Sequence, residues 1–302
     1  MRLKFVLLIF CIGLSVASCS QTKLTPNDKP IVITTTEMVA DIARNIGGDF
    51  ISVTSLISPG VDPHQYKCSE KDIIKLAGAD IIFYNGLNLE GKLYKILRRA
   101  QREIPTYAVG DYIPKEKLIF NGGTPDPHVW FDPNLWIYAV KNVADGLINI
   151  DPQNAIYYRK NEELYIRELM ECNKNIIKYL EAVPENKRTF ITSHNAFSYF
   201  NAAYGWNIIG ILDVNASGET SVQPLVKTIF ERDIKHIFTE TSIPSRFADA
   251  LVASVEAADG TVRRGAPLYS DSLGEYGSGA DTYLGMLISN INSIVAEIMS
   301  NE

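Results

Sequence analysis

The sequence predicts an α/β fold of two lobes, each a mainly parallel β-sheet flanked by helices, joined by one long rigid α-helix. From Pro30 onward, short β-branched runs alternate with amphipathic stretches, which is the pattern of a parallel sheet covered by helices. A stretch without glycine or proline covers 153–183, and the alternation resumes after it. A chain of 302 residues is long enough for two such lobes.

We place the N-terminal lobe at residues 30–150. Its first helix is closed by Gly47-Gly48, and its second is opened by Ser69 and Asp72, a variant of the capping box. Asp132-Pro133 begins a third helix, because Asp is a good N-cap and Pro is favoured at the first helical position. The predicted strands are 31–35, 50–57, 80–84 and 104–109, and the predicted helices are 37–46, 69–77 and 132–149.

A linker helix is expected at 151–183, because Asp151-Pro152 repeats the start signal and Pro184 stops the pattern. The 31 residues from 153 to 183 would span about 45 Å as one helix, more than a single lobe needs. The C-terminal lobe then covers 184–302. Its predicted strands are 189–192, 206–212, 236–240 and 266–269, and its predicted helices are 221–231 (capped by Ser221), 245–257 and 281–299.

The N-terminus has the composition of a lipoprotein signal peptide, which we place at residues 1–18. A basic start is followed by an apolar run over 5–16, too short for a spanning helix. The sequence VASC resembles the bacterial lipobox, so Cys19 is the expected lipid anchor and residues 19–29 a polar tether. An ordinary signal peptide with a chance cysteine is the alternative. No later segment is expected to span a bilayer.

Composition excludes some classes of protein. A hydrophobic fraction of 46% and a charged fraction of 21% are typical of a packed globular chain. The net charge of −6 argues against nucleic acid as a partner, because phosphate binding needs a basic face. Beyond the signal and the anchor, only Cys68 and Cys172 remain, which is neither a disulfide scaffold nor a CxxC metal motif. We expect free thiols, although a single bridge between the two stays open.

Three of the four histidines lie in loops at strand ends or helix starts. His64 follows the second predicted strand, His128 precedes the helix at 132, and His194 ends the first strand of the second lobe. Asp271 follows that lobe's last strand. Ligands of open parallel sheets bind beyond the carboxyl ends of the strands, so all four side chains can face one inter-lobe cleft. Imidazole with carboxylate suits zinc, manganese and ferrous iron.

Each of these residues also has a purely structural interpretation. A lone histidine is more often a surface or core residue than a ligand, but Asp-Pro-His occurs twice, and proline fixes the backbone before each histidine. Asp62 and Asp126 can be turn formers instead of functional groups. Asp271 can be a helix cap or a solvated loop carboxylate.

Glu240 and Cys68 are further candidates for the same site, whereas His236 is not. Glu240 ends its strand toward the cleft, where it would either orient a ligand histidine or stand as a solvated loop carboxylate. Cys68 would share a face with His64 in a helix, but it precedes the cap at Ser69 and the four-ligand set is already complete. His236 begins a strand, away from the carboxyl ends, and we assign it no role.

Four motifs in order resemble the metal-specific solute-binding proteins of ABC importers, the TroA/PsaA/ZnuA-like group often called cluster 9. The resemblance runs from about Ile31 to the C-terminus, with candidate ligands 64, 66 and 77 residues apart. The motifs are PGVDPHQY at 59–66, DPHVWFDP at 126–133, HNAFSYF at 194–200 and YSDSLG at 269–274.

The resemblance implies that His64 and His128 are ligands from the first lobe, and His194 and Asp271 ligands from the second. It also implies two lobes joined by one long helix, and an ABC permease with its ATPase as partners. We therefore expect a monomeric lipoprotein on the extracytoplasmic face of a bacterial membrane, periplasmic or outer, that captures a divalent transition metal for import. It would be no enzyme.

Metal identity is left open by the sequence. The segment 111–124 lacks the histidines that zinc-specific members resembling this chain often carry, whereas several manganese members have Glu where His194 stands. Zinc and manganese both fit, and ferrous iron is a third candidate. Two functions from different classes also stay open. They are an extracytoplasmic zinc-dependent hydrolase with Glu240 as its base, and a surface adhesin.

Overall fold

The structure, a computed structural model, describes residues 29–212 and 222–300. The predicted signal peptide, Cys19 and the tether up to residue 28 lie outside these ranges. Ser221, the expected cap of a helix, also lies outside them, and the helix in question begins after Val222.

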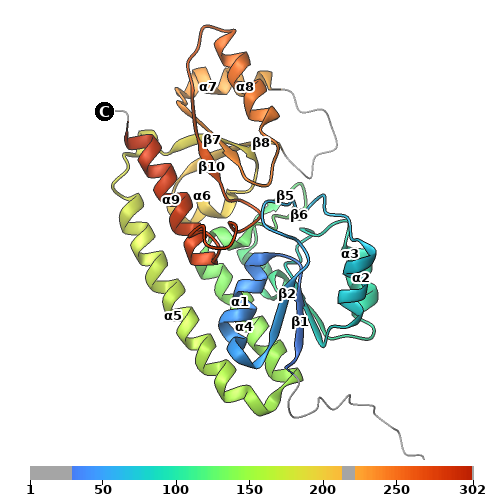
Figure 1. Cartoon of the computed structure of the whole chain (residues 1–302). Coiled ribbons are helices and arrows are strands. Elements are labelled where there is room, and N and C mark those ends of the chain that lie inside the picture. Colours follow the sequence, from blue (N-terminus) through green and yellow to red (C-terminus); the bar gives the residue numbers. More distant parts are fainter. Residues whose placement is uncertain (1–28, 213–221, 301–302) are drawn as a thin grey trace, which may run out of the picture.

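The N-terminal lobe contains a four-stranded sheet in the order β2-β1-β3-β4, with every pair of strands parallel (Figure 1). Side chains alternate across this sheet, so Val32 and Phe83 face one core and Ile33 and Ile82 face another. Helices α1 and α4 cover the first face, and α2 and α3 cover the second. The elements are β1 (Ile31–Thr34), α1 (Glu37–Gly47), β2 (Ser52–Ser55), α2 (Glu70–Ala77), β3 (Ile81–Tyr84), α3 (Tyr94–Ala100), β4 (Thr106–Ala108) and α4 (Pro133–Ile150).

The C-terminal lobe repeats this architecture with the strand order β10-β9-β7-β8, again all parallel. Helices α7 and α8 pack on one face of its sheet through a separate apolar cluster, and α9 packs on the other. The elements are β7 (Thr189–His194), α6 (Ser198–Tyr204), β8 (Asn207–Leu212), α7 (Gln223–Arg232), β9 (His236–Glu240), α8 (Arg246–Glu256), β10 (Arg263–Leu268) and α9 (Tyr283–Met299). The two-lobe α/β prediction is confirmed.

Helix α5 (Ala155–Leu180) runs along both lobes and contacts α1 and α4 of the N-terminal lobe and α9 of the C-terminal lobe (Figure 1). It has 26 residues, which correspond to about 39 Å, and is shorter than the 31 residues expected. The difference arises at both ends. Pro152–Asn154 forms a separate 3₁₀ turn, η5, and the helix ends four residues before Pro184, the predicted stop.

The remaining differences concern short elements. Helices α3 and α6 and the two-residue strands β5 (Phe120–Asn121) and β6 (Thr124–Pro125) were not predicted, because segments this short show too few periods of any pattern. The predicted strand at 50–57 begins only at Ser52, since Gly48–Phe50 forms the 3₁₀ turn η1. The capping box of Ser69 and Asp72 is present as expected.

The two lobes share one apolar core, which limits how far they can move apart. Trp136 from α4 stacks on Tyr283 from α9 with ring centroids 5.6 Å apart. Phe131 stacks on Phe197 in the same way at 4.4 Å. The indole N–H of Trp130 donates a hydrogen bond to the Ser270 carbonyl at 2.8 Å, within the same buried region. Aromatic packing and a buried hydrogen bond thus cross the interface together.

A buried polar contact ties α5 to the N-terminal lobe. The Tyr165 hydroxyl donates to Asp41 Oδ2 of α1 at 2.6 Å, and both side chains are almost fully buried. Burial raises the pKa of Asp41 to about 6, because the charged carboxylate loses its hydration there. The hydroxyl offsets part of this cost by donating to the carboxylate.

Tyr165→Phe should therefore lower the free energy of unfolding by roughly 1–3 kcal/mol at neutral pH, the cost of leaving a buried acceptor unsatisfied. Urea denaturation measures the change. Tyr179→Phe removes the same hydroxyl from a 46% exposed position of the same helix and should change the unfolding free energy by less than about 0.5 kcal/mol. Equal effects of the two substitutions would contradict the assigned contribution.

Candidate metal centre

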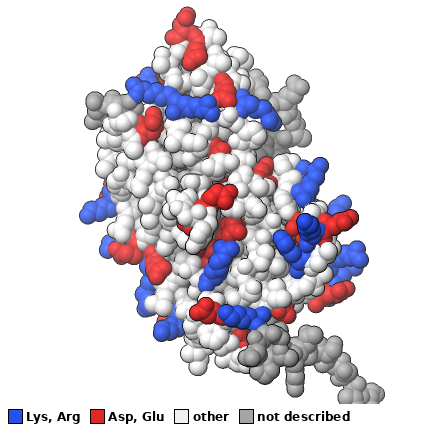
Figure 2. All heavy atoms as spheres, viewed as in Figure 1, with Lys and Arg blue, Asp and Glu red and all other residues white. Residues whose placement is uncertain are grey.

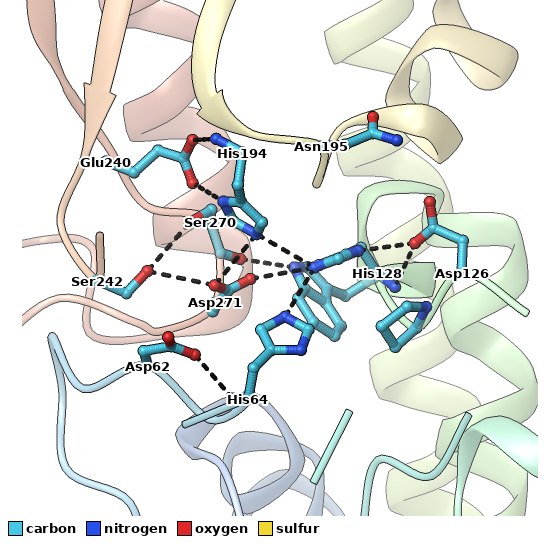
Figure 3. A network of polar contacts seen from close by, with 12 residues as sticks. Asp62, His64, Asp126, His128, His194, Asn195, Glu240, Ser242, Ser270 and Asp271 are labelled. Atoms are coloured by element: carbon cyan, nitrogen blue, oxygen red, sulfur yellow. Dashed lines mark hydrogen bonds and ion pairs between the residues drawn. The ribbon is translucent and has the colours of Figure 1, made fainter. Parts of the chain in front are cut away.

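Four side chains converge where the lobes meet: His64, His128, His194 and Asp271 (Figure 3). Each offers one donor atom, and these atoms all lie within 4.8 Å of one another. The Nε2 atom of His128 is 3.3 Å from Nε2 of His64 and 3.3 Å from Nε2 of His194. Asp271 Oδ1 lies 3.4 Å from His128 Nε2, and its Oδ2 lies 3.3 Å from His194 Nε2. A cluster of donors this close can hold one metal ion.

The parallel strands explain why these residues meet. His194 is the last residue of β7, and Asp271 follows β10 by three residues, so both lie at the carboxyl edge of the second sheet. His64 lies in the loop after β2, at the carboxyl edge of the first sheet. His128 immediately precedes the 3₁₀ turn η4 (Val129–Phe131), which leads into α4.

The repeated Asp-Pro-His sequence makes the same turn twice. Asp62 Oδ1 accepts from the backbone N–H of His64 at 2.7 Å, and Asp126 Oδ1 accepts from that of His128 at 2.9 Å. Both aspartates are thus turn formers, one of the two roles open to them from the sequence. Asp126 does more, because its Oδ1 also lies 2.7 Å from Nδ1 of the His128 ring.

Two of the imidazole rings each have a carboxylate at Nδ1, the ring nitrogen that faces away from the centre of the cluster. Asp126 contacts Nδ1 of His128, and Glu240 Oε2 lies 2.5 Å from Nδ1 of His194 (Figure 3). Glu240 Oε1 also accepts from the His194 backbone N–H at 2.8 Å, which fixes the end of β7 to the end of β9. Each contact occupies Nδ1 and leaves Nε2 directed at the centre of the cluster. Among the described residues, no carboxylate holds the ring of His64 in this way.

Burial differs among the four donors. His128, His194 and Asp271 are at most 1% exposed, whereas His64 is only half-buried. The Ser242 hydroxyl donates to Asp271 Oδ2 at 3.3 Å, and Ser242 also contacts the Ser270 hydroxyl at 3.2 Å. Three donors are therefore fixed inside the protein, and His64 forms the wall nearest to solvent.

The charged groups shift one another's pKa values. Burial alone would lower the pKa of His128, but its hydrogen bonds to Asp126 and Asp271 raise it. Asp271 and Glu240 likewise raise the pKa of His194 well above its usual value, against the effect of burial. The two histidines in turn hold the pKa of Asp271 well below its usual range despite its burial. Burial lowers the pKa of His64 to about 3, so this ring is neutral.

These pKa shifts indicate what the cluster can bind. Without metal, the raised pKa values of His128 and His194 favour their protonated forms, whose positive charge balances the buried carboxylates. A divalent cation placed among the Nε2 atoms and Asp271 would supply the same positive charge and displace those protons. Three imidazole nitrogens and a carboxylate oxygen are donors that Zn²⁺, Mn²⁺ and Fe²⁺ accept.

Cys68 and His236 lie outside the cluster. The Cys68 thiol contacts the Ser69 carbonyl at 3.6 Å, and both Cys68 and Cys172 are free. His236 lies at the amino-terminal start of β9, the opposite edge of the sheet from His194.

A buried support for the His128 loop was not predicted from the sequence. The Asn85 side chain donates to the Pro127 carbonyl at 3.1 Å, and Glu90 Oε1 accepts from the Asn85 N–H at 2.7 Å. The Thr35 hydroxyl also donates to Glu90 Oε1 at 2.7 Å, which links the ends of β1 and β3 beneath that loop. Burial raises the pKa of Glu90 to about 7. Asn85 gave a signal in the sequence, because this polar residue directly follows a buried strand, much as Glu240 ends one.

Comparison with known proteins agrees with this geometry. Residues 32–297 match the ZnuA family, described as "Zinc-uptake complex component A periplasmic". The manganese-binding lipoprotein MntA of Bacillus subtilis is 41% identical over 268 residues, which cover 87% of this chain and 88% of MntA. The iron ABC transporter substrate-binding lipoprotein MtsA of Streptococcus pyogenes is 30% identical over 309 residues, 97% of each chain.

The zinc-binding protein TroA of Treponema pallidum is similar in both sequence and structure. It is 35% identical over 274 residues, which cover 89% of each chain. Its solved structure superimposes with a TM-score of 0.87 over 90% of this chain and 99% of that one. The family match spans both lobes and all four clustered residues. This chain therefore belongs to the ZnuA/TroA/PsaA family of metal-binding solute-binding proteins of ABC importers.

Proposed function

We propose that this protein binds one divalent transition-metal ion through His64, His128, His194 and Asp271 and delivers it to an ABC permease and its ATPase. The observation that carries the proposal is the convergence of these four donors from both lobes. The deep burial of three of them adds support, because a buried polar cluster of this kind needs a cation or protons to balance it. Cys19, as the lipid anchor, would hold the monomeric protein on the extracytoplasmic face of the membrane. Throughout the described residues, no helix has the length and apolar character needed to cross a bilayer.

The bound metal would be zinc, manganese or ferrous iron. The names of MntA, TroA and MtsA specify manganese, zinc and iron in turn, so similarity alone does not choose among them. Intrinsic affinity for nitrogen and oxygen donors favours zinc over manganese, and the metal carried in the cell would depend on geometry and availability.

Catalysis is not part of the proposed function. A hydrolytic zinc site keeps one position open for water, whereas Asp271 supplies a fourth donor here. Glu240, the candidate base of a hydrolase, instead contacts the ring and backbone of His194. MntA, TroA and MtsA are metal-binding and transport proteins, and their names support neither the hydrolase nor the adhesin alternative.

Capture would begin at His64, the one donor that is half-buried and neutral in the metal-free protein. Its loop meets the second lobe where the Gly60 N–H donates to the Ser272 hydroxyl at 3.0 Å. The remaining donors are already in place, so metal binding would need small local shifts and the release of protons. The shared aromatic core opposes a wide separation of the lobes.

Calorimetric titration of chelator-treated residues 20–302 tests the site directly. Zn²⁺, Mn²⁺ and Fe²⁺ are titrated separately, the iron without oxygen, and at least one should bind in one-to-one stoichiometry. His64→Ala should weaken that binding at least roughly tenfold. Cys68→Ala, four residues away, should leave it unchanged. A lack of stoichiometric binding by any of the three ions would overturn the proposal.

The raised pKa values of His128 and His194 predict that metal binding releases protons. These groups hold protons to a higher pH than an ordinary histidine, so metal affinity should fall as pH falls, beginning above about pH 6.5. Titration in buffers of different ionisation enthalpy at one pH measures the released protons. Heats that do not depend on the buffer would mean that the imidazoles are already neutral.

Glu240→Gln should weaken metal binding roughly tenfold to a hundredfold. The neutral amide would not hold the His194 ring in the tautomer and orientation that the carboxylate favours. Glu275→Gln provides a matched loss of one negative charge at an exposed position of the loop after Asp271, and should not change affinity. Thermal unfolding of both metal-free variants checks the fold. If Glu240→Gln binds metal like the unaltered protein, its carboxylate has no part in orienting the ligand.

A further inference from the structure

Basic side chains form a row on the outer face of α3. Lys95, Arg98 and Arg99 follow helical spacing, Arg102 lies in the turn that follows, and all four are exposed. With Gln101 they surround a hollow of about 710 Å³. The apolar residues Leu93 and Leu97 are fully buried on the inner side. This segment is therefore amphipathic, with cations on the face that meets solvent.

An apolar groove of about 540 Å³ separates α2 from α3. Lys95 and Arg99 line this groove as well as the neighbouring hollow, so the basic row and the groove form one continuous surface. On the α2 side, Ile73 is 44% exposed, and the adjacent Ile74 is 72% exposed. The apolar lining consists of Ile73, Leu76, Ala77, Ile96, Ala100 and Ile104.

The charge of this region opposes that of the whole protein. The chain carries a net charge of −6, yet eight exposed Lys and Arg side chains lie between residues 67 and 104. In the same stretch Glu70 and Glu103 are the exposed acids, since Asp72 and Glu90 are buried and Asp80 is half-buried. Figure 2 shows Lys and Arg gathered at the right-hand edge, over α2 and α3, with a few acidic side chains among them.

The chain enters the fold at one end of this surface. The Ile31 N–H donates to Asp80 Oδ2 at 2.7 Å, and the Asp80 N–H donates to the Ile31 carbonyl at 2.9 Å. Asp80 follows the C-terminal end of α2 by three residues. Twelve residues lead from Cys19 to Ile31, and they can span at most roughly 40 Å. A lipid on Cys19 would keep Ile31, which lies beside the C-terminal end of α2, within that distance of the bilayer.

We infer that the α2–α3 surface, defined by Ile73, Ile74, Lys95, Arg98, Arg99 and Arg102, binds anionic phospholipid headgroups. Cations attract the negative surface of the membrane, and exposed isoleucines beside them enter the headgroup boundary, as in interfacial helices. A lipid surface suits these residues better than an acidic protein, because the anchor holds them near the bilayer. This proximity rests on the anchor of the proposed function, whereas headgroup binding does not depend on metal binding.

Vesicle flotation of residues 20–302, which include all described residues of both lobes, tests the inference without the lipid. The protein should bind vesicles of equal parts phosphatidylglycerol and phosphatidylcholine, and should not bind phosphatidylcholine alone. Added salt should release it, because the attraction is screened. The double variant Lys95→Glu, Arg99→Glu should bind the mixed vesicles at least about tenfold more weakly.

Lys160→Glu, Lys178→Glu is the matched control, with the same change of net charge at exposed positions of α5. It should bind the mixed vesicles nearly as well as the unaltered protein. Equal loss in both double variants would overturn the inference, since net charge alone would explain it. Absence of binding to either vesicle would also overturn it, and would leave an acidic protein surface as the partner. Metal titration of both variants separates this result from a failure of the metal site.

Discussion

Asp271 and the rings of His128 and His194 lie almost fully removed from water at the point where the two lobes meet. Ionised groups in such a place are costly unless opposite charges and hydrogen bonds surround them. Asp126 and Glu240 stand behind the two rings, so the carboxylates and imidazoles form one compact unit. That unit needs positive charge at its centre, which either protons or a divalent cation can supply. Because the buried carboxylates need that positive charge, the geometry of the site favours the binding of a metal cation.

A cluster of this kind also demands a firm scaffold, because donors from two sheets must stay within a few ångströms of one another. The buried bond from Trp130 to Ser270 joins the two parts of the chain that carry His128 and Asp271. The Tyr283 hydroxyl donates to the Trp130 carbonyl at 2.7 Å, so α9 holds the same point from behind. The same contacts therefore hold the two lobes together and keep the donors buried. The ring of His64 is the least constrained of the four donors, because it lacks a supporting carboxylate among the described residues.

Sequence patterns predicted the four residues that cluster here, because those patterns depend on local features. Strand ends, the repeated Asp-Pro-His and the position of Glu240 can all be read along the chain, and parallel strands bring their carboxyl ends together. The support from Asn85 and Glu90 was missed because its partners, Thr35 and Pro127, are distant in sequence. Short helices such as α3 carry too few turns for a periodic signal. The α2–α3 groove could not be foreseen either, since it exists only once two separate helices pack side by side.

The polarity of the sheets also relates the anchor to the site. The chain enters at the amino-terminal end of β1, whereas His64 and His194 lie at carboxyl ends of strands that run parallel within each lobe. In the anchored protein that we propose, the metal cluster therefore lies at the end of the N-terminal lobe that is remote from the lipid. A site placed there would meet the surrounding medium during capture. Delivery to a permease in the same membrane would then require the protein to turn relative to its proposed anchor.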